Sequence, residues 1–249
     1  MKLQSNTNKV ISKKSLGQNF IQDKNFLLKL DSLIISDNDT NIYEIGPGTG
    51  ALTNHLIKKK FKNLFLIEKD NLLYEELKNK YKDIKNIFTV NADALYYNYE
   101  KNNKEEKSLI VGNLPFNVSS QLLINWIVNF KWPPFYSKMI LMFQKEVANR
   151  IVATHNQKSY SRLSVITQAR CKTKILLDAP SNIFVPKPKV DGTIVEFTPI
   201  TKNVDVDILN LQILLKKSFK QRRKKIKTSL KDYNYLLKDL NIDENLRAE

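Results

Sequence analysis

Short apolar runs, rich in β-branched and aromatic residues and bounded by Gly, Asn or Asp, recur along the chain. Such runs are typical of strands, and the segments between the first five runs have the apolar spacing of helices. The predicted strands are 41–46, 63–68, 86–91, 108–113, 137–143, 172–178 and 192–198. The predicted helices are 23–35, 50–60, 70–80 and 119–130.

Alternating strands and helices form right-handed βαβ units, so we expect an α/β fold with a mostly parallel seven-stranded sheet covered on both faces. Ligands of such sheets bind at the carboxyl ends of the strands. The last two strands are joined by a Pro-rich link, 180–188, which predicts an antiparallel hairpin at the sheet edge. Beyond about 204 the pattern is helical, and we expect domains at 1–199 and 200–249.

The composition narrows the class of protein. Of 249 residues, 42% are hydrophobic and 27% charged, which permits a sizeable core and excludes wholesale disorder. No apolar run approaches the roughly 18 residues that span a bilayer, and the N-terminus lacks a signal-peptide pattern, so we expect a cytoplasmic protein without membrane contact. The single cysteine, Cys171, excludes an internal disulfide, and the two histidines offer no zinc-ligand spacing, so no metal is expected.

Positive charge is concentrated near both ends of the chain. The formal net charge is +16, from 41 Lys and Arg against 25 Asp and Glu. Residues 216–231 hold nine basic residues and no acid, and residues 1–22 hold four lysines and no acid. Such patches favour contact with nucleic-acid phosphates, although a solvated basic helix would show the same pattern.

A glycine-rich turn, EIGPGTGA at 44–51, lies where the first predicted strand meets its helix. Glycines allow a tight turn and close approach of the backbone to a nucleoside. Two spacings fit this segment: G-x-G-x-x-A, which suits a dinucleotide, and E-x-G-x-G-x-G, which suits S-adenosylmethionine.

Two acids lie at the ends of consecutive predicted strands. Glu68 ends the second strand, where a carboxylate accepts hydrogen bonds from ribose hydroxyls, and Asp93 follows the third, where it is placed to accept from an adenine amine. Either acid alone fits a helix N-cap or a loop charge equally well. Together with the glycine turn, they predict a nucleoside pocket.

The fourth predicted strand ends in Asn113-Leu114-Pro115-Phe116. The lone pair of an adenine or cytosine amine is delocalised, and an Asn oxygen with a nearby carbonyl would favour a pyramidal, nucleophilic nitrogen. Pro115 restrains Leu114 to an extended conformation, and Phe116 offers a face for stacking. The target base must then leave its helix, and no dedicated general base is needed. A strand-ending turn with a core Phe is the structural alternative.

Seven segments, in order along the chain, resemble those of the ribosomal RNA adenine dimethyltransferases, and most closely the bacterial branch that modifies the small subunit. They are SLGQNF at 15–20, EIGPGTG at 44–50, Glu68, NADA at 91–94, NLPFNVSS at 113–120, FVPKPKV at 184–190 and FKQRRKKIKTSL at 219–230. The resemblance implies a Rossmann-like class I methyltransferase domain with a C-terminal helical domain that contacts RNA and the ribosome. It also implies S-adenosylmethionine as donor and two adjacent adenosines, in a hairpin near the 3′ end of small-subunit rRNA, as substrate during ribosome biogenesis.

The resemblance also assigns residue roles. Asn113, Leu114, Pro115 and Phe116 would hold the target adenine, with Phe184 on its other side unless this ring belongs to the core. A monomer is expected, with Arg222, Arg223, Lys224 and Lys225 on the rRNA of the small subunit. The expected cofactor contacts are Asn19, Ile21, Gly46, Glu68, Asp93 and Asn113.

The chain departs from the family pattern in three places. Ile21 replaces the more common Leu, which a backbone contact tolerates. Phe116 replaces the usual Tyr, which keeps the stacking face and loses the hydroxyl. The tail beyond 230 is short, so the helical domain is expected to be trimmed.

Three rival interpretations remain open. The antibiotic-resistance branch methylates large-subunit rRNA with the same pocket. A non-catalytic nucleic-acid binder, like relatives of mitochondrial transcription factor B, would share the fold, but the intact pocket residues argue against lost chemistry. A nicotinamide-dependent oxidoreductase would use the G-x-G-x-x-A spacing, but it leaves the Asn-Leu-Pro-Phe segment and the basic tail without a purpose.

Overall fold

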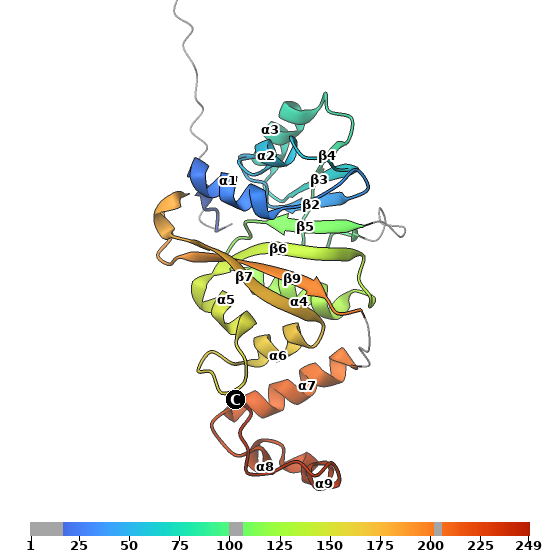
Figure 1. The fold of residues 1–249 in the computed structure, drawn as a ribbon, viewed down its shortest axis with the longest axis vertical. Coiled ribbons are helices and arrows are strands. Elements are labelled where there is room, and N and C mark those ends of the chain that lie inside the picture. Colours follow the sequence, from blue (N-terminus) through green and yellow to red (C-terminus); the bar gives the residue numbers. More distant parts are fainter. Residues whose placement is uncertain (1–16, 100–106, 202–205) are drawn as a thin grey trace, which may run out of the picture.

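A computed structural model describes residues 17–99, 107–201 and 206–249. Its main sheet has seven strands in the order β4-β3-β2-β5-β6-β9-β7 (Figure 1). The first five pair in parallel, and β9 is antiparallel to both β6 and β7. The strands of this sheet are β2 (Asn41–Ile45), β3 (Asn63–Glu68), β4 (Ile87–Asn91), β5 (Ser108–Gly112), β6 (Tyr136–Gln144), β7 (Cys171–Ala179) and β9 (Gly192–Pro199).

All seven predicted strands lie in this sheet, and the predicted hairpin at its edge is confirmed by the antiparallel pairing of β7 with β9. Helices occupy both faces. The α-helices that pack on the sheet or connect its strands are α1 (Lys24–Leu33), α2 (Thr53–Leu56), α3 (Asn71–Tyr81), α4 (Ser119–Asn129), α5 (Lys145–Val152) and α6 (Arg162–Gln168). The predicted helix over 50–60 is shorter than expected: α2 spans only Thr53–Leu56, after a turn that begins at left-handed Gly50.

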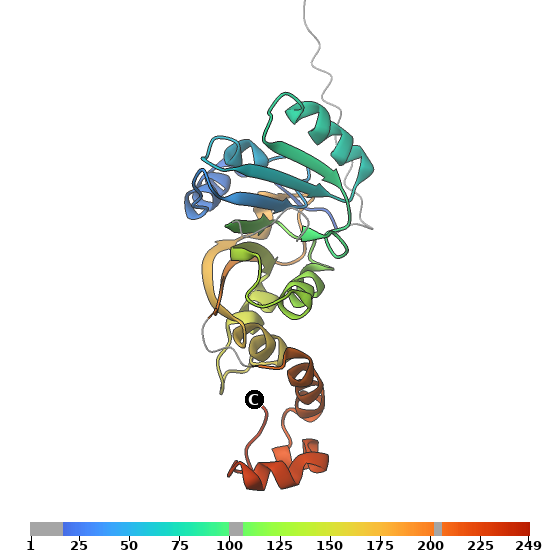
Figure 2. The same cartoon turned by 90° about the vertical axis from the view of Figure 1, so that its right-hand side faces the viewer.

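The alternation of side chains along each strand divides the core into two layers. On one face, Tyr43 and Phe65 pack with residues of α4 and α5; on the other, Ile42 and Leu64 pack with residues of α1, α2 and α3. Figure 2 shows α1 and α4 on opposite sides of the sheet. Parallel strands covered on both faces bury nearly every side chain, which explains why β2 and β5 are buried throughout.

A second, two-stranded sheet pairs β1 (Phe20–Ile21) with β8 (Phe184–Val185) in antiparallel fashion. Each strand is too short to give a periodic signal, so sequence patterning does not reveal this sheet. The chain just before α1 is held against the carboxyl ends of the main strands, beside the segment that precedes β9.

The C-terminal segment is helical, as expected. It contains α7 (Ile208–Ser218), η4 (Phe219–Gln221), α8 (Ile226–Ser229), η5 (Lys231–Tyr233) and α9 (Asn234–Asp239), and a further single turn, η3 (Ser181–Ile183), precedes β8. Ile208 and Leu215 of α7 pack on Ile166 of α6 and Val128 of α4. Figure 1 shows α8 and α9 at the opposite end of the molecule from α3.

Within the described residues, no helix has the length and apolar character needed to cross a bilayer. In the same part of the chain, no three His, Cys, Asp or Glu side chains gather as a metal site would require.

Candidate active site

A cavity of about 190 Å³ opens at the carboxyl ends of β2, β3, β4 and β5. This is where parallel α/β sheets bind ligands. Nine sequence-predicted residues line it together: Asn19, Ile21, Gly46, Glu68, Asp93, Asn113, Leu114, Pro115 and Phe116. The glycine turn and the fourth-strand tip therefore share one cavity, which the nucleoside interpretation requires.

The glycine turn after β2 needs its glycines. Gly46, Gly48 and Gly50 all have positive φ, at 64°, 59° and 78°, a region that costs other residues free energy. At Gly48 space is also short, because an added Cβ would lie 2.9 Å from Cε1 of Phe20. The glycine turn therefore packs directly against Phe20 of β1, and its backbone forms part of the cavity wall.

Glu68 ties this turn to the neighbouring strand. Its Oε2 accepts a hydrogen bond from Gly48 N–H at 3.1 Å, and its Oε1 accepts from Asp70 N–H at 2.9 Å. Burial raises the pKa of Glu68, and the two backbone N–H groups act against this rise. Each carboxylate oxygen retains a lone pair, which suits acceptance from two vicinal hydroxyls.

Asp93 lies beside Glu68 because β3 and β4 pair with Glu68 opposite Asn91. Its Oδ1 accepts from Leu95 N–H at 3.0 Å, and its Oδ2 pairs with Lys69 Nζ at 2.7 Å. Burial alone would raise the pKa of Asp93, but these donors outweigh burial and lower it. Asp93 is therefore an ionised acceptor at this end of the cavity.

Asn113 has a defined orientation. Its Nδ2 donates to the backbone carbonyl of Asn19 at 2.9 Å. Because a carbonyl oxygen only accepts, this contact places the amide nitrogen of Asn113 toward Asn19. Oδ1 is then available to accept a hydrogen bond from a ligand. Gly112, which sequence analysis did not single out, permits this placement, since an added Cβ there would lie 2.7 Å from the carbonyl oxygen of Ile45.

The two predicted stacking rings differ in position. Phe116 is half-buried at the cavity, and its ring meets that of Phe184 edge to face, with centroids 6.4 Å apart. Phe184 is only 2% exposed and belongs to the core layer beneath α1, so it supports the Phe116 ring from behind. The core alternative considered for Phe184 is thus what this structure shows.

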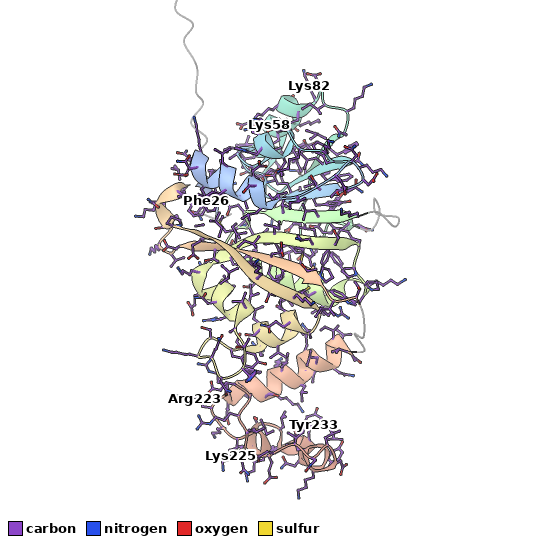
Figure 3. All side chains as sticks on the ribbon, viewed as in Figure 1. Phe26, Lys58, Lys82, Arg223, Lys225 and Tyr233 are labelled. Carbon is purple, nitrogen blue, oxygen red and sulfur yellow. The ribbon has the colours of Figure 1, made fainter. Side chains whose placement is uncertain are left out.

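The predicted RNA-contact residues lie away from the cavity, between η4 and α8. Arg223, Lys224 and Lys225 are exposed, and Figure 3 shows Arg223 and Lys225 at the end of the molecule opposite Lys82. Arg222 is partly engaged, because it donates to the carbonyl of Lys158 and pairs with Glu249 at 3.4 Å. The lysines at 2, 9, 13 and 14 lie outside the described residues.

Three contacts near the cavity were not predicted. Gln18 Nε2 donates to Asp70 Oδ2 at 3.0 Å, and this bond anchors the residues just before β1 to the start of α3. Left-handed Gly17 packs against Asn117, whose Oδ1 would lie 2.8 Å from an added Cβ. Glu44 accepts from Thr53 Oγ1 at 2.7 Å, and burial raises its pKa to about 8. Glu44 is the first residue of the E-x-G-x-G-x-G pattern, and this pattern is the sequence feature that could have identified it.

Comparison with known proteins agrees with this geometry. A family model described as ribosomal RNA adenine dimethylase matches residues 10–246. Ribosomal RNA small subunit methyltransferase A of Bradyrhizobium diazoefficiens is 37% identical over 245 residues, which cover 96% of this chain and 86% of the relative.

Two solved structures show the same fold. A dimethyladenosine transferase from Plasmodium falciparum has a TM-score of 0.75 at 24% identity, covering 90% of this chain and 82% of that one. The 23S rRNA methyltransferase ErmE has a TM-score of 0.70 at 21% identity, covering 92% of both chains. The seven-stranded Rossmann-like methyltransferase fold expected from the sequence is confirmed.

The spacing of the glycines fits either a dinucleotide or S-adenosylmethionine, and the matched family decides between these two cofactors. A methyltransferase uses S-adenosylmethionine, and a cavity with a glycine turn, two carboxylates and an oriented amide fits that cofactor. The nicotinamide interpretation is thereby excluded. The chain belongs to the ribosomal RNA adenine dimethylase family of S-adenosylmethionine-dependent enzymes.

Proposed function

We propose that this enzyme dimethylates, on the exocyclic nitrogen, two adjacent adenosines in a hairpin near the 3′ end of small-subunit rRNA. The relatives' name supports the small subunit as target. The observation that carries the chemistry is the bond from Asn113 Nδ2 to the Asn19 carbonyl, because it leaves an oxygen acceptor beside the glycine turn.

The donor end of the cavity is assigned to residues of the first three parallel strands. When bound, S-adenosylmethionine supplies an electrophilic methyl group. Glu68 accepts from the ribose hydroxyls, and Asp93 accepts from the adenine amine of the cofactor. The backbone of Asn19, Ile21 and Gly46 lines the remaining wall.

The acceptor end is assigned to the tip of β5. Asn113 Oδ1 accepts a hydrogen bond from the target amine, which directs the nitrogen lone pair toward the methyl donor. Leu114 and Pro115 complete this wall, and the Phe116 ring stacks on the base, with Phe184 supporting that ring from the core. Phe116 performs this role without the hydroxyl of a tyrosine. The proton leaves to solvent.

The C-terminal helices are assigned to RNA binding. Residues 200–249 form a small domain on the methyltransferase domain 1–199, and the protein acts as a monomer. Arg222, Arg223, Lys224 and Lys225 meet backbone phosphates, where their contribution depends on salt rather than on sequence. The exposure of the last three favours this role.

Methylation of isolated subunits tests the proposal. The protein is incubated with labelled S-adenosylmethionine and with unmethylated small or large subunits, and the nucleosides are resolved by mass spectrometry. We expect N6,N6-dimethyladenosine in small-subunit rRNA. Dimethyladenosine confined to large-subunit rRNA would assign the chain to the resistance branch instead. Binding of subunits with no methyl transfer to either would support a non-catalytic binder.

A further inference from the structure

Lys69 and Asp93 meet across the ends of two neighbouring strands. Lys69 follows the last residue of β3, and Asp93 follows β4 by two residues. Their side chains pair at 2.7 Å between Nζ and Oδ2, and both residues line the cavity. The place of Asp93 after the third predicted strand indicates a contact with the cofactor adenine, whereas no sequence motif assigns a role to Lys69.

This pair fixes the carboxylate of Asp93 in one orientation. Oδ2 is held by Lys69, and Oδ1 is held by the backbone N–H of Leu95 at 3.0 Å. The Asp93 side chain is 25% exposed and the Lys69 side chain 61% exposed, so the ammonium lies on the solvent side of the carboxylate. Each oxygen retains a lone pair for a ligand within the cavity.

We propose that Lys69 is a positioning residue that holds Asp93 as a fixed, ionised acceptor, so that the cavity selects a cofactor whose purine carries an exocyclic amine. The inference rests on the proposed function, in which this cavity holds the adenosyl group. Within that function, the pair of Lys69 with Asp93 sets the base specificity for the cofactor.

The chemistry of purines gives this arrangement its selectivity. Adenine presents an amine, which donates to an ionised carboxylate. Hypoxanthine presents a carbonyl oxygen at the same position, and that oxygen faces the carboxylate as a second acceptor. A carboxylate free to rotate, or to take up a proton and donate, would accommodate both bases. Burial favours the protonated form of Asp93, and the opposing charge of Lys69 keeps the carboxylate ionised.

Isothermal titration calorimetry with two nucleosides tests the inference. S-adenosylhomocysteine and its inosine counterpart, S-inosylhomocysteine, are titrated into the full-length protein and its variants. For the unchanged protein we expect a preference for adenine of about 10- to 100-fold, as for a site that loses one charged hydrogen bond. Lys69→Met retains the aliphatic stem and removes the charge. It should reduce the preference about two- to fivefold, within the range of a partly exposed ion pair.

Three variants serve as controls. Lys69→Arg preserves the charge and should restore the preference to within about twofold. Asp93→Asn can either donate or accept, so it should abolish the preference. Lys82→Met changes an exposed lysine at the end of α3, which Figure 3 shows at the tip of the molecule, and should change neither affinity. Thermal melts confirm that each variant is folded.

The outcomes distinguish a wrong role for Lys69 from a wrong assignment of the cofactor site. If the unchanged protein binds neither nucleoside, the proposed cofactor site is wrong. If it prefers adenine strongly and Lys69→Met preserves that preference, the site stands and Lys69 has no positioning role. A Lys69→Met variant that retains its preference but needs more RNA for half-maximal methylation would instead assign the ammonium to an RNA phosphate.

Discussion

Substitution of Gly48 by alanine tests how the glycine turn supports the site. Gly48 has φ of 59°, and its N–H donates to Glu68. An added Cβ would lie 2.9 and 3.0 Å from two atoms of the Phe20 ring, so the ring must move. Phe20 belongs to β1, which covers the cavity. We therefore expect Gly48→Ala to lower both stability and cofactor affinity.

The magnitude follows from two contributions. A non-glycine residue in the left-handed region costs about 1–2 kcal/mol. Displacing the Phe20 ring from its rotamer adds about 0.5–1.5 kcal/mol. Gly46→Ala is the matched control, because Gly46 has φ of 64° but an added Cβ there meets nothing nearer than 3.9 Å. It should therefore show the first contribution without the second.

Urea unfolding of both variants, and of each combined with Phe20→Ala, measures these contributions. Gly48→Ala should lower the free energy of unfolding by about 1.5–3.5 kcal/mol, and truncation of Phe20 should relieve about 0.5–1.5 kcal/mol of that cost. No relief is expected for Gly46→Ala. Equal destabilisation by the two alanines, with no coupling to Phe20, would refute the argument that β1 packs on this turn.

Three further predictions concern pH, reactivity and RNA binding. Burial raises the pKa of Glu44 from 4.5 to about 8, so between these pH values the folded protein holds a proton that the unfolded protein has released. The free energy of unfolding should therefore fall as pH rises through this range. Glu44→Gln should flatten that fall in unfolding experiments at successive pH values. Cys171 is buried, with its pKa raised to about 12, so a thiol reagent should label it at pH 8 only after denaturation. Changing Arg223, Lys224 and Lys225 to Gln should weaken RNA binding and reduce its logarithmic salt slope by about 2–3.

Each of these predictions has a control and a contrary result. An unchanged dependence of stability on pH in Glu44→Gln would show that the buried carboxylate is already ionised across this range. Rapid labelling of native protein would contradict the burial of Cys171. For RNA binding, three exposed lysines at the other end of the molecule serve as the control. Figure 3 shows Lys58 and Lys82 there, and Lys85 follows α3 by four residues. Equal effects of the two triple changes would mean that only net charge matters.

Much of the fold follows from local patterns. The central strands of the main sheet are apolar runs with clear ends, and burial on both faces keeps such runs nearly continuous, as in NLFLIE at 63–68. Helices α5 and α6 were not predicted. They contain eight and seven residues, so each offers only about two turns of apolar spacing, less than the window over which a helical period can be recognised.

The site was predictable where strand order brings residues together. Glu68 ends β3 and Asp93 lies two residues beyond β4, and because these strands pair in parallel, their carboxyl ends bring both acids to one cavity. Contacts that depend on the exact path of loops were not predictable. The bond from Asn113 to Asn19 spans 94 residues, and the pair of Lys69 with Asp93 depends on how two loops turn after their strands.

Asn113 is assigned to activate the target amine beside the methyl donor, and the methylation rate of Asn113→Ala on small subunits decides whether it does. The measurement is made at saturating S-adenosylmethionine and RNA. We predict a rate at least about a hundredfold lower, since an oriented polar group that acts in the transition state is removed. A rate within a few-fold of the unchanged protein would contradict the claim.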